Sequence, residues 1–390
     1  MNTIKTEISE LIPWMIAFRR DLHAHPELSF EEYETTEKII NELNKLEHIQ
    51  ILKPFKTGCA AILKGPYDGK TLLLRADIDA LPIQEENDLE FISLNNKVMH
   101  ACGHDGHTAM MLAACKYFDK HYEEIHGKGI FLFQHAEELP PGGAIEWANY
   151  GICDCVDELY GLHLSSNYPT GKFGIRVGAL TSATDRFDIE IIGKGGHSAF
   201  PETTLDPMIT AGEIITSLQT IVSRKIKAVE PIVVSICQIN GGDAYNIIPE
   251  RIRLTGSTRT FNPETRKNLP LMMEKIIKGI CDSNDMNYEF NFTLGYASVI
   301  NDKDITLRSK EIIENTFGKE ATFDIEPLMP GEDYSALQGK CDAFFVELGA
   351  RNEEKGIIYP HHNSHYLLDE KALAYGLIYW IELINNRLGA

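Results

Sequence analysis

The chain has 390 residues, a length that predicts two domains, and its 43% hydrophobic and 24% charged residues are typical of a globular protein with a full core. The formal net charge is −20, so the surface repels phosphate backbones and anionic lipid, and we expect neither nucleic acid nor a membrane as a partner. No run approaches the about 18 consecutive apolar residues that would predict a membrane span.

The first half of the chain alternates helix and strand patterns. Residues 4–22 and 31–46 have the apolar spacing of helices, and residues 107–118 (HTAMMLAACKYF) have the pattern of a buried helix. On either side of that buried helix, residues 71–76 (TLLLRA) and 130–133 (IFLF) are continuous apolar runs, which are typical of strands covered on both faces. The alternation predicts an α/β fold, a mostly parallel sheet with helices on both faces.

The middle of the chain, from about residue 183 to residue 294, has a different rhythm. Its order of strand, helix, strand, strand, helix and strand is that of a ferredoxin-like α+β unit. The predicted segments are, in order, 186–192, 206–223, 232–239, 251–257, 263–281 and 288–294. We therefore predict a lid or dimerisation domain, residues 183–294, inserted into a catalytic domain made of residues 1–182 and 295–390.

The ends and the cysteines of the chain predict a cytoplasmic protein. Residues 1–10 lack an apolar run behind a basic start, so no secretory signal is expected. The eight cysteines are scattered through the chain without the density of a disulfide framework. Cys153 and Cys155 form a CxC pair of the kind that binds metals, but no second soft cluster with ligand spacing accompanies it.

The densest cluster of metal-competent residues is His100-Ala-Cys-Gly-His-Asp-Gly-His107. Three histidines, a cysteine and an aspartate within this short segment, separated by glycines, suit a loop that brings several ligands onto one ion. A thiolate and imidazole nitrogens favour zinc or another late first-row metal. The alternative is a polar loop in which Asp105 caps the following helix.

Two adjacent carboxylates, Glu137 and Glu138, follow the predicted strand 130–133. Open α/β sheets build their sites at the carboxyl ends of strands. On an irregular turn the two side chains can point differently, so that one binds a metal ion and the other stays available as a base. The alternative is a solvated acidic pair.

Three further groups of polar residues lie at strand ends or in a polar loop. His163 ends an apolar strand, Asp77 and Asp79 follow the strand 71–76, and the segment 361–365 (HHNSH) contains three histidines. Taken singly, a strand-end histidine usually makes a structural hydrogen bond, and a histidine-rich loop can be inert. Together the five groups make a metal site the economical explanation.

These segments resemble the aminoacylase-like metallopeptidases, and most of all the branch of hippurate hydrolases, N-acetyldiaminopimelate deacetylases and plant auxin-conjugate hydrolases. The resemblance covers nearly the whole chain in order, and its most specific parts are ACGHDGH and AEE…GGA. The matching segments are 19–32 (RRDLHAHPELSFEE), 75–83 (RADIDALPI), 100–110 (HACGHDGHTAM), 133–144 (FQHAEELPPGGA), 193–201 (GKGGHSAFP), 246–250 (NIIPE), 256–261 (GSTRTF), 331–337 (GEDYSAL) and 361–370 (HHNSHYLLDE).

The resemblance implies an enzyme with two divalent metal ions per subunit, of zinc, manganese, cobalt or nickel. Cys102 matches the bridging thiolate, and Glu137 matches the catalytic base. Asp79, rather than its neighbour Asp77, matches the aspartate that orients the base or a metal ligand. The remaining matched ligands are His104, Glu138, His163 and His362, the last chosen over His361 by aligning HNSHYLLDE with the end of the family pattern.

The implied reaction is hydrolysis of an N-acyl amino acid to a carboxylate and a free amino acid. His197 and Asn246 in the inserted domain match groups that reach the substrate, and Arg259 is a further candidate for its carboxylate, although it could equally be an exposed strand residue. Related enzymes form dimers through this domain, which implies a homodimer or homotetramer. The acyl group and the amino acid side chain are not readable from the sequence.

Three other functions compete with this interpretation. A dipeptidase or carboxypeptidase acting on short peptides would share every residue named. A cysteine hydrolase would use Cys102 with His104 or His107, and a binding protein would have no use for a base at Glu137. The chain also departs from the family pattern at His135, where proline is frequent, and at His365, where an aromatic residue is frequent. We expect His135 to change packing or pocket shape and not the reaction.

Overall fold

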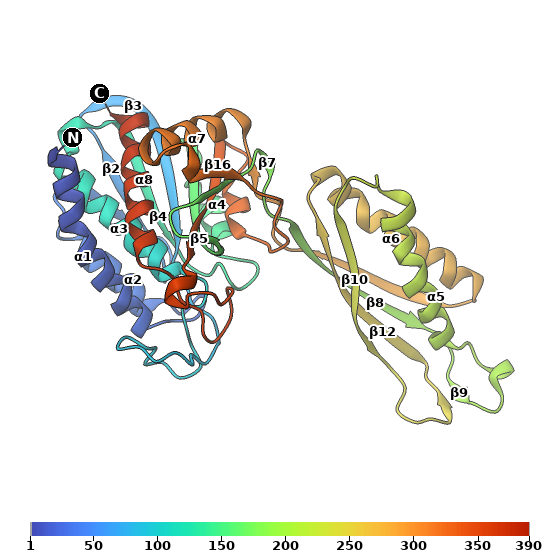
Figure 1. The fold of residues 1–390 in the computed structure, drawn as a ribbon. Helices are drawn as coiled ribbons and strands as arrows, with labels where there is room; N and C mark the ends of the chain where they lie inside the picture. The colour runs from blue at the N-terminus through green and yellow to red at the C-terminus, as the bar shows by residue number, and fades with distance from the viewer. Residues whose placement is uncertain (1, 390) are drawn as a thin grey trace. The chain divides into compact units, whose positions relative to one another are not determined.

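The chain folds into two compact units in a computed structural model that describes residues 2–389. The first unit runs to Leu180 and also includes Ile300–Glu326 and the chain from Asp333 onward. The second unit is Thr181–Val299 together with Pro327–Glu332 (Figure 1). The predicted bounds of 183 and 294 lie inside the longer segment, and the return of six residues to the second unit was not predicted.

The first unit is built on an eight-stranded sheet that is parallel at its centre. β4, β3, β5 and β16 are neighbours in this order and run parallel, while β1 and β2 add an antiparallel edge. At the other edge β6 runs antiparallel to β16 and parallel to β15. The strands, in sheet order, are β1 Ile49–Leu52, β2 Cys59–Lys64, β4 His126–Gln134, β3 Tyr67–Asp77, β5 Glu158–Pro169, β16 Asp342–Arg351, β6 Phe173–Ile175 and β15 Thr322–Asp324.

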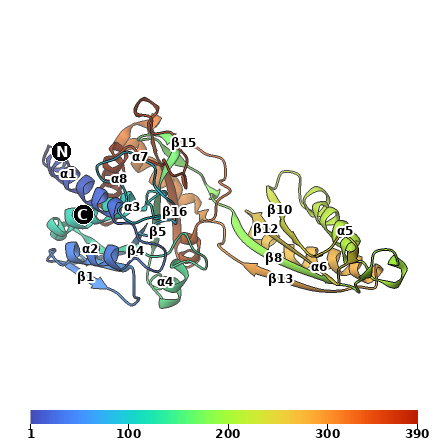
Figure 2. The ribbon, with the colours of Figure 1, turned by 90° about the horizontal axis from the view of Figure 1, so that it is seen from below.

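Helices cover both faces of this sheet, as predicted. α1, α3 and α8 lie together on one face, and the short α4 lies on the other (Figures 1 and 2). The apolar runs of β3 and β4 are buried against α3, and most of α3 is itself buried. The helices are α1 Asn2–Ala24, α2 Tyr33–Leu43, α3 His104–Lys120, α4 Ala144–Tyr150, α7 Lys303–Phe317 and α8 Lys371–Leu388, and β7 Gly178–Ala179 pairs with β14 Ile300–Asn301.

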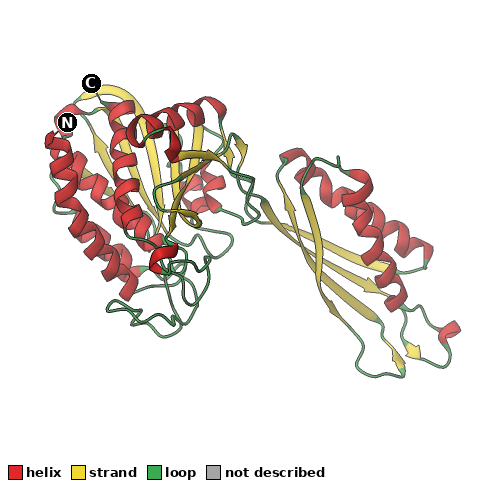
Figure 3. Ribbon diagram, viewed as in Figure 1, coloured by secondary structure: helices red, strands yellow, loops and turns green. Residues whose placement is uncertain are grey.

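The second unit has the predicted order of strand, helix, strand, strand, helix and strand. Its antiparallel sheet has the strand order β10-β12-β8-β13, and α5 and α6 pack on it and on each other (Figure 3). Buried Phe187, Ile189 and Ile191 alternate along β8 and face the helices in a core separate from that of the first unit. The elements are β8 Ala183–Ile192, β9 Gly196–His197, α5 Pro207–Thr220, β10 Ile232–Asn240, β11 Ile247–Ile248, β12 Arg251–Thr260, α6 Pro263–Ser283 and β13 Asn287–Leu294.

Within residues 2–389, no helix is both long enough and apolar enough to cross a membrane. The expectation that membranes are not partners otherwise stays a prediction from charge.

One buried carboxylate ties several elements of the first unit together at the amino-terminal end of β5. Glu158 accepts hydrogen bonds from Arg387 of α8 at 2.6 and 2.9 Å, from Lys70 of β3 at 2.6 Å and from the Tyr160 hydroxyl at 2.8 Å. Although burial opposes it, these bonds lower the pKa of Glu158 from 4.5 to about 2. The carboxylate is therefore stabilised in its charged form by the fold.

We expect Glu158→Gln to lower the free energy of unfolding at pH 7 by roughly 1–3 kcal/mol, because charge-assisted hydrogen bonds are lost. A carboxylate with a depressed pKa stabilises the fold above its ordinary pKa of 4.5, and that stabilisation is lost as the pH falls toward about 2. Urea unfolding at a series of pH values should therefore show the two proteins converging over this range. A difference that stays constant below pH 4.5 would contradict the prediction.

Candidate active site

The candidate site lies at the carboxyl ends of the central parallel strands. β3 ends at Asp77, β4 ends at Gln134 just before Glu137, and His163 lies near the middle of β5. Because these strands are parallel neighbours, their carboxyl ends meet along one edge of the sheet. Residues that are far apart in the sequence therefore come together there.

The segment His100–His107 is not a single loop, because α3 begins at His104. Gly103 precedes the helix with φ of 93°, a left-handed conformation that favours glycine. A Cβ atom at Gly103 would also lie 2.9 Å from the Tyr366 hydroxyl. Cys102 and His104 therefore lie on either side of Gly103. Both the backbone conformation and the nearby Tyr366 hydroxyl disfavour a larger residue at this position.

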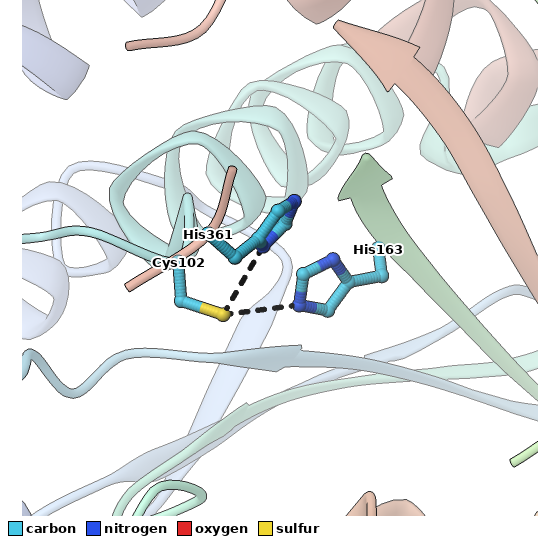
Figure 4. Close-up of side chains that lie close together, drawn as sticks. All are labelled: Cys102, His163 and His361. Carbon is cyan, nitrogen blue, oxygen red and sulfur yellow. Dashed lines mark hydrogen bonds between the residues drawn. The ribbon is translucent and has the colours of Figure 1, made fainter. Parts of the chain in front are cut away.

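All five residues that were predicted to bind metal lie in one cluster. The Cys102 sulfur is 3.5 Å from His163 Nε2, and Cys102, His104 and Glu138 offer ligand atoms within 4.8 Å of one another. His362 Nε2 is 3.3 Å from Glu138 Oε1. Cys102 is thus common to two groups of donors, and its thiol faces the neighbouring rings (Figure 4).

In both His104 and His163, hydrogen bonds engage Nδ1 and leave Nε2 available for a metal ion. His104 Nδ1 lies 3.0 Å from the carbonyl oxygen and 3.2 Å from Oδ1 of Asp79, so it donates its proton there. His163 Nδ1 donates to the Leu164 carbonyl at 2.9 Å. Each neutral ring then has its lone pair on Nε2. His104 Nε2 is buried and makes no hydrogen bond among the described residues, which fits a donor meant for a cation.

His361 also approaches Cys102, but its nitrogens are differently engaged. Its Nε2 accepts a hydrogen bond from the Ser166 backbone N–H at 2.9 Å. The neutral ring must then carry its proton on Nδ1, which lies 3.5 Å from the Cys102 sulfur (Figure 4). No lone pair is left on this ring for a metal ion, in contrast to His163 on the other side of the sulfur.

The carboxylates around His104 and Cys102 favour positive charge in the cluster. Although burial opposes it, the carboxylates of Asp77 and Asp79 raise the pKa of His104 to about 10. Burial, followed by the charges of Glu138 and Glu137, raises the pKa of the Cys102 thiol well above its ordinary value. A cation at this place offsets both effects, because it favours the thiolate and the neutral imidazole that bind it.

His107 is a structural residue and not a catalytic base. Its Nδ1 lies 2.5 Å from Asp77 Oδ1, and its Nε2 accepts the Leu164 N–H at 2.8 Å. A thiol whose pKa is raised by burial is also the opposite of a nucleophilic cysteine, which needs a depressed pKa. These two observations argue against a cysteine hydrolase that pairs Cys102 with His107.

Glu137, Glu138 and Asp79 meet at the turn that follows β4. Asp79 Oδ2 accepts hydrogen bonds from the Ser29 hydroxyl at 2.7 Å and from the backbone N–H of Glu138 at 3.0 Å. Asp79 therefore orients both His104 and the backbone of Glu138. Glu137, which directly precedes Glu138, is buried, with 7% of its surface exposed.

The departure from the family pattern at His135 affects packing on the opposite side of this turn. His135 is buried, its Nε2 lies 3.0 Å from Glu146, and its ring contacts Phe30 and Phe55. These side chains line a cavity of about 480 Å³. That His135 changes packing or pocket shape and not the reaction stays a prediction.

A buried network that the sequence analysis missed supports the start of α3. Asp105 accepts a hydrogen bond from His23 at 2.8 Å and pairs with Arg19 at 2.7 Å, and His23 Nε2 lies 3.2 Å from Glu85. These side chains are all buried. Segment 19–32, which contains Arg19 and His23, was the part of the sequence that pointed to this network. The contacts themselves join residues about eighty positions apart, as His23 and Asp105 are, and cannot be read from spacing.

In the second unit, a two-stranded ribbon of β9 and β11 brings His197 and Asn246 together. The Ser198 N–H donates to the Asn246 carbonyl at 3.1 Å, and His197 lies opposite Ile247. His197 Nδ1 accepts the Ala199 N–H at 3.1 Å, so the neutral ring carries its proton on Nε2. The exposed Nε2 is then a hydrogen-bond donor, as an oxyanion or a carboxylate requires.

Arg259 does not join this pair within the unit. It lies opposite Thr184, where β8 begins, whereas Arg251 lies opposite Ile192, where β8 ends and leads to His197. The eight residue steps along β12 from Arg251 to Arg259 span about 26 Å. The Arg259 guanidinium donates to the Thr258 carbonyl at 2.9 Å. Arg259 therefore lies at the opposite end of β8 from the segment that leads to His197.

The model of the peptidase family M20/M25/M40 matches residues 73–386. The chain belongs to this family. It is 47% identical over 298 residues to N-acyl-L-amino acid amidohydrolase of Geobacillus stearothermophilus, a match that covers 76% of this chain and 80% of that protein. Over 371 residues it is 39% identical to N-acetylcysteine deacetylase of Bacillus subtilis, which covers 95% of each.

The three-dimensional comparison agrees with family membership. The chain resembles the crystal structure of a dinuclear metal-binding M20 peptidase from Bacillus subtilis with a TM-score of 0.85 at 35% identity, covering 96% of this chain and 98% of that one. The resemblance and the α/β fold that were predicted from the sequence are therefore confirmed, and this M20 family member is a hydrolase.

We expect Asp105→Ala to lower the free energy of unfolding by about 3–5 kcal/mol, because it leaves the buried Arg19 guanidinium without its carboxylate at 2.7 Å. Asp154→Ala is the matched control, since its pair with Lys340 is more than half exposed on both sides. The control should cost at most about 1 kcal/mol. Urea unfolding measures both, and similar losses in the two variants would contradict the assignment.

Proposed function

We propose that this M20 family hydrolase cleaves the amide bond of N-acyl amino acids, releasing a carboxylate and a free amino acid with the help of two divalent metal ions. The observation that carries the proposal is the cluster of five donors that includes Cys102. In this cluster His104 Nε2 is buried and makes no hydrogen bond among the described residues. The names of the related amidohydrolase and deacetylase support the substrate class. The dinuclear structure of the Bacillus subtilis peptidase supports two ions.

The metal ions would be held by Cys102, His104, Glu138, His163 and His362. His104 and His163 present Nε2 atoms, and Glu138 and His362 approach each other at 3.3 Å. His362 is preferred over His361, because both nitrogens of His361 are engaged. Thiolate, imidazole and carboxylate together suit zinc, and manganese, cobalt or nickel are the alternatives.

The metal ions supply Lewis-acid polarisation of the scissile carbonyl and acidify water, and the residues of the chain supply positioning and proton transfer. Glu137, buried beside the donor cluster, takes the proton of the attacking water and delivers it to the leaving amine. Asp79 keeps His104 in the tautomer that leaves Nε2 available. His197, protonated on Nε2, donates to the oxyanion, with Asn246 beside it.

Short peptides are the second candidate substrate, for a dipeptidase or a carboxypeptidase. The family takes its name from peptidases, and the donor cluster and Glu137 would act on any amide bond of similar size. We place N-acyl amino acids first because both of the named relatives act on such compounds by name.

A homodimer, alone or as half of a tetramer, accounts for the separation of the substrate-binding candidates. Arg259 lies opposite Thr184 at the start of β8, whereas His197 and Asn246 belong to the ribbon that follows the other end of β8. In a dimer, His197 and Asn246 would serve the partner's site. Strand β10 offers an edge for pairing, since it has one neighbour and Ile239 on it is 60% exposed. The cytoplasm, which keeps cysteines reduced, suits a metal-binding Cys102.

Metal removal should abolish hydrolysis, and zinc or manganese should restore it. A panel of N-acetyl and N-benzoyl amino acids and dipeptides, assayed by amine release, ranks the substrate classes. Glu137→Gln should lower kcat by at least about 100-fold while two metal equivalents stay bound, because a general base contributes to rate and not to metal binding. Full activity of Glu137→Gln, or activity that survives chelation, would exclude the proposed mechanism.

Two inactive variants should complement each other if the site is shared between subunits. Glu137→Gln and His197→Ala, mixed after mild dissociation and reassociation, should recover about a quarter of the wild-type activity, since half of the dimers are mixed and each mixed dimer has one intact site. The variants incubated separately are the control. Absence of recovery, with mixed dimers demonstrated by differential tagging, would show that each subunit uses its own His197.

A further inference from the structure

Two glutamates of the same N-terminal segment have different partners. Glu27 caps α2, because its two carboxylate oxygens accept the N–H groups of Glu34 at 3.1 Å and Thr35 at 2.7 Å. Glu32 stands at the N-cap position of α2 but makes no capping bond. Its fully buried carboxylate instead accepts the N–H of Ala136 at 2.7 Å. Glu32 therefore reaches a turn that is 104 positions away in the sequence.

That turn has an unfavourable backbone conformation at Ala136. Its φ of 52° lies in the left-handed region, which is sterically unfavourable for a non-glycine residue. Both polar groups of Ala136 are held: the N–H by Glu32, and the carbonyl by the Gly143 N–H at 2.9 Å. The conformation is thus maintained by its neighbours and not by the residue itself.

The residues that follow Ala136 are the ones that perform the proposed chemistry. Glu137 comes next, and the N–H of Glu138 donates to Asp79 at 3.0 Å. The backbone of Glu137 therefore lies between two points held by carboxylates, Glu32 before it and Asp79 after it. Asp79 also holds the ring of His104, whereas the Glu32 bond goes to the backbone of the turn.

We infer that Glu32 is a positioning residue for amide hydrolysis, and that its hydrogen bond to the left-handed Ala136 aims the Glu137 carboxylate at the reacting water. The inference rests on the proposed function, in which Glu137 moves the proton. Misplacing a base affects the transition state more than substrate binding, so the effect should fall on kcat and not on KM. The Glu32 bond goes to the backbone of Ala136 and not to any of the five donors to metal.

Three variants test the inference. Glu32→Ala removes the acceptor and should lower kcat roughly 10- to 100-fold, with KM and metal content unchanged. Glu32→Gln keeps a carbonyl oxygen at the same distance along the side chain, so it should restore kcat to within about threefold of wild type. Glu27→Ala is the matched control: it removes the cap of α2, lowers Tm and leaves kcat unchanged.

Hydrogen exchange of the peptide that contains Ala136 provides a readout without substrate. Exchange should accelerate in Glu32→Ala and remain at the wild-type rate in Glu32→Gln and Glu27→Ala. Wild-type kcat in Glu32→Ala, an equal loss in Glu32→Gln, or an equal loss in Glu27→Ala would each overturn the inference. An inactive wild-type enzyme would instead overturn the proposed function, and the exchange data would still show whether Glu32 holds the turn.

Discussion

Buried negative charge at one edge of a parallel sheet is the constraint on which this structure depends. Asp77, Asp79, Glu137 and Glu138 gather where β3 and β4 end, and the first two are almost fully buried. Carboxylates removed from water need cations or hydrogen-bond donors nearby. Arg75 compensates Asp77 at 2.6 Å. The remainder of the edge is electrostatically suited to divalent cations, which explains why imidazole and thiol side chains converge on it.

The donor atoms are selected by a second layer of hydrogen bonds. Asp79 determines which nitrogen of His104 is free, the Leu164 carbonyl does so for His163, and the Ser166 N–H removes His361 from the donors. The Leu164 carbonyl and the Ser166 N–H are backbone groups of β5. The sheet therefore fixes the hydrogen bonds that determine which nitrogen of each histidine carries the proton. The fold thereby decides which of several histidines can act as ligands.

Much of this arrangement could be predicted from the sequence, because it follows from local patterns. The apolar run before Asp77 and that before Glu137 predicted buried strands, and the metal-competent residues lie at their ends as expected. What could not be predicted depends on long-range partners. The choice between His361 and His362 is informed by the Ser166 N–H, and the partner of Glu32 lies 104 positions away. Spacing carries no information about such contacts.

The second unit is joined to the first by four peptide connections and not by two, since Pro327–Glu332 returns to it after Ile300–Glu326. The last connection ends at Asp333, whose carboxylate accepts hydrogen bonds from Arg75 at 2.8 Å and from the Ala144 N–H at 3.0 Å. A chimera that exchanges this unit between homologues must therefore transplant residues 181–299 and 327–332 together. The same constraint applies in evolution: the segments 181–299 and 327–332 should diverge together, while Asp333 should vary with the first unit.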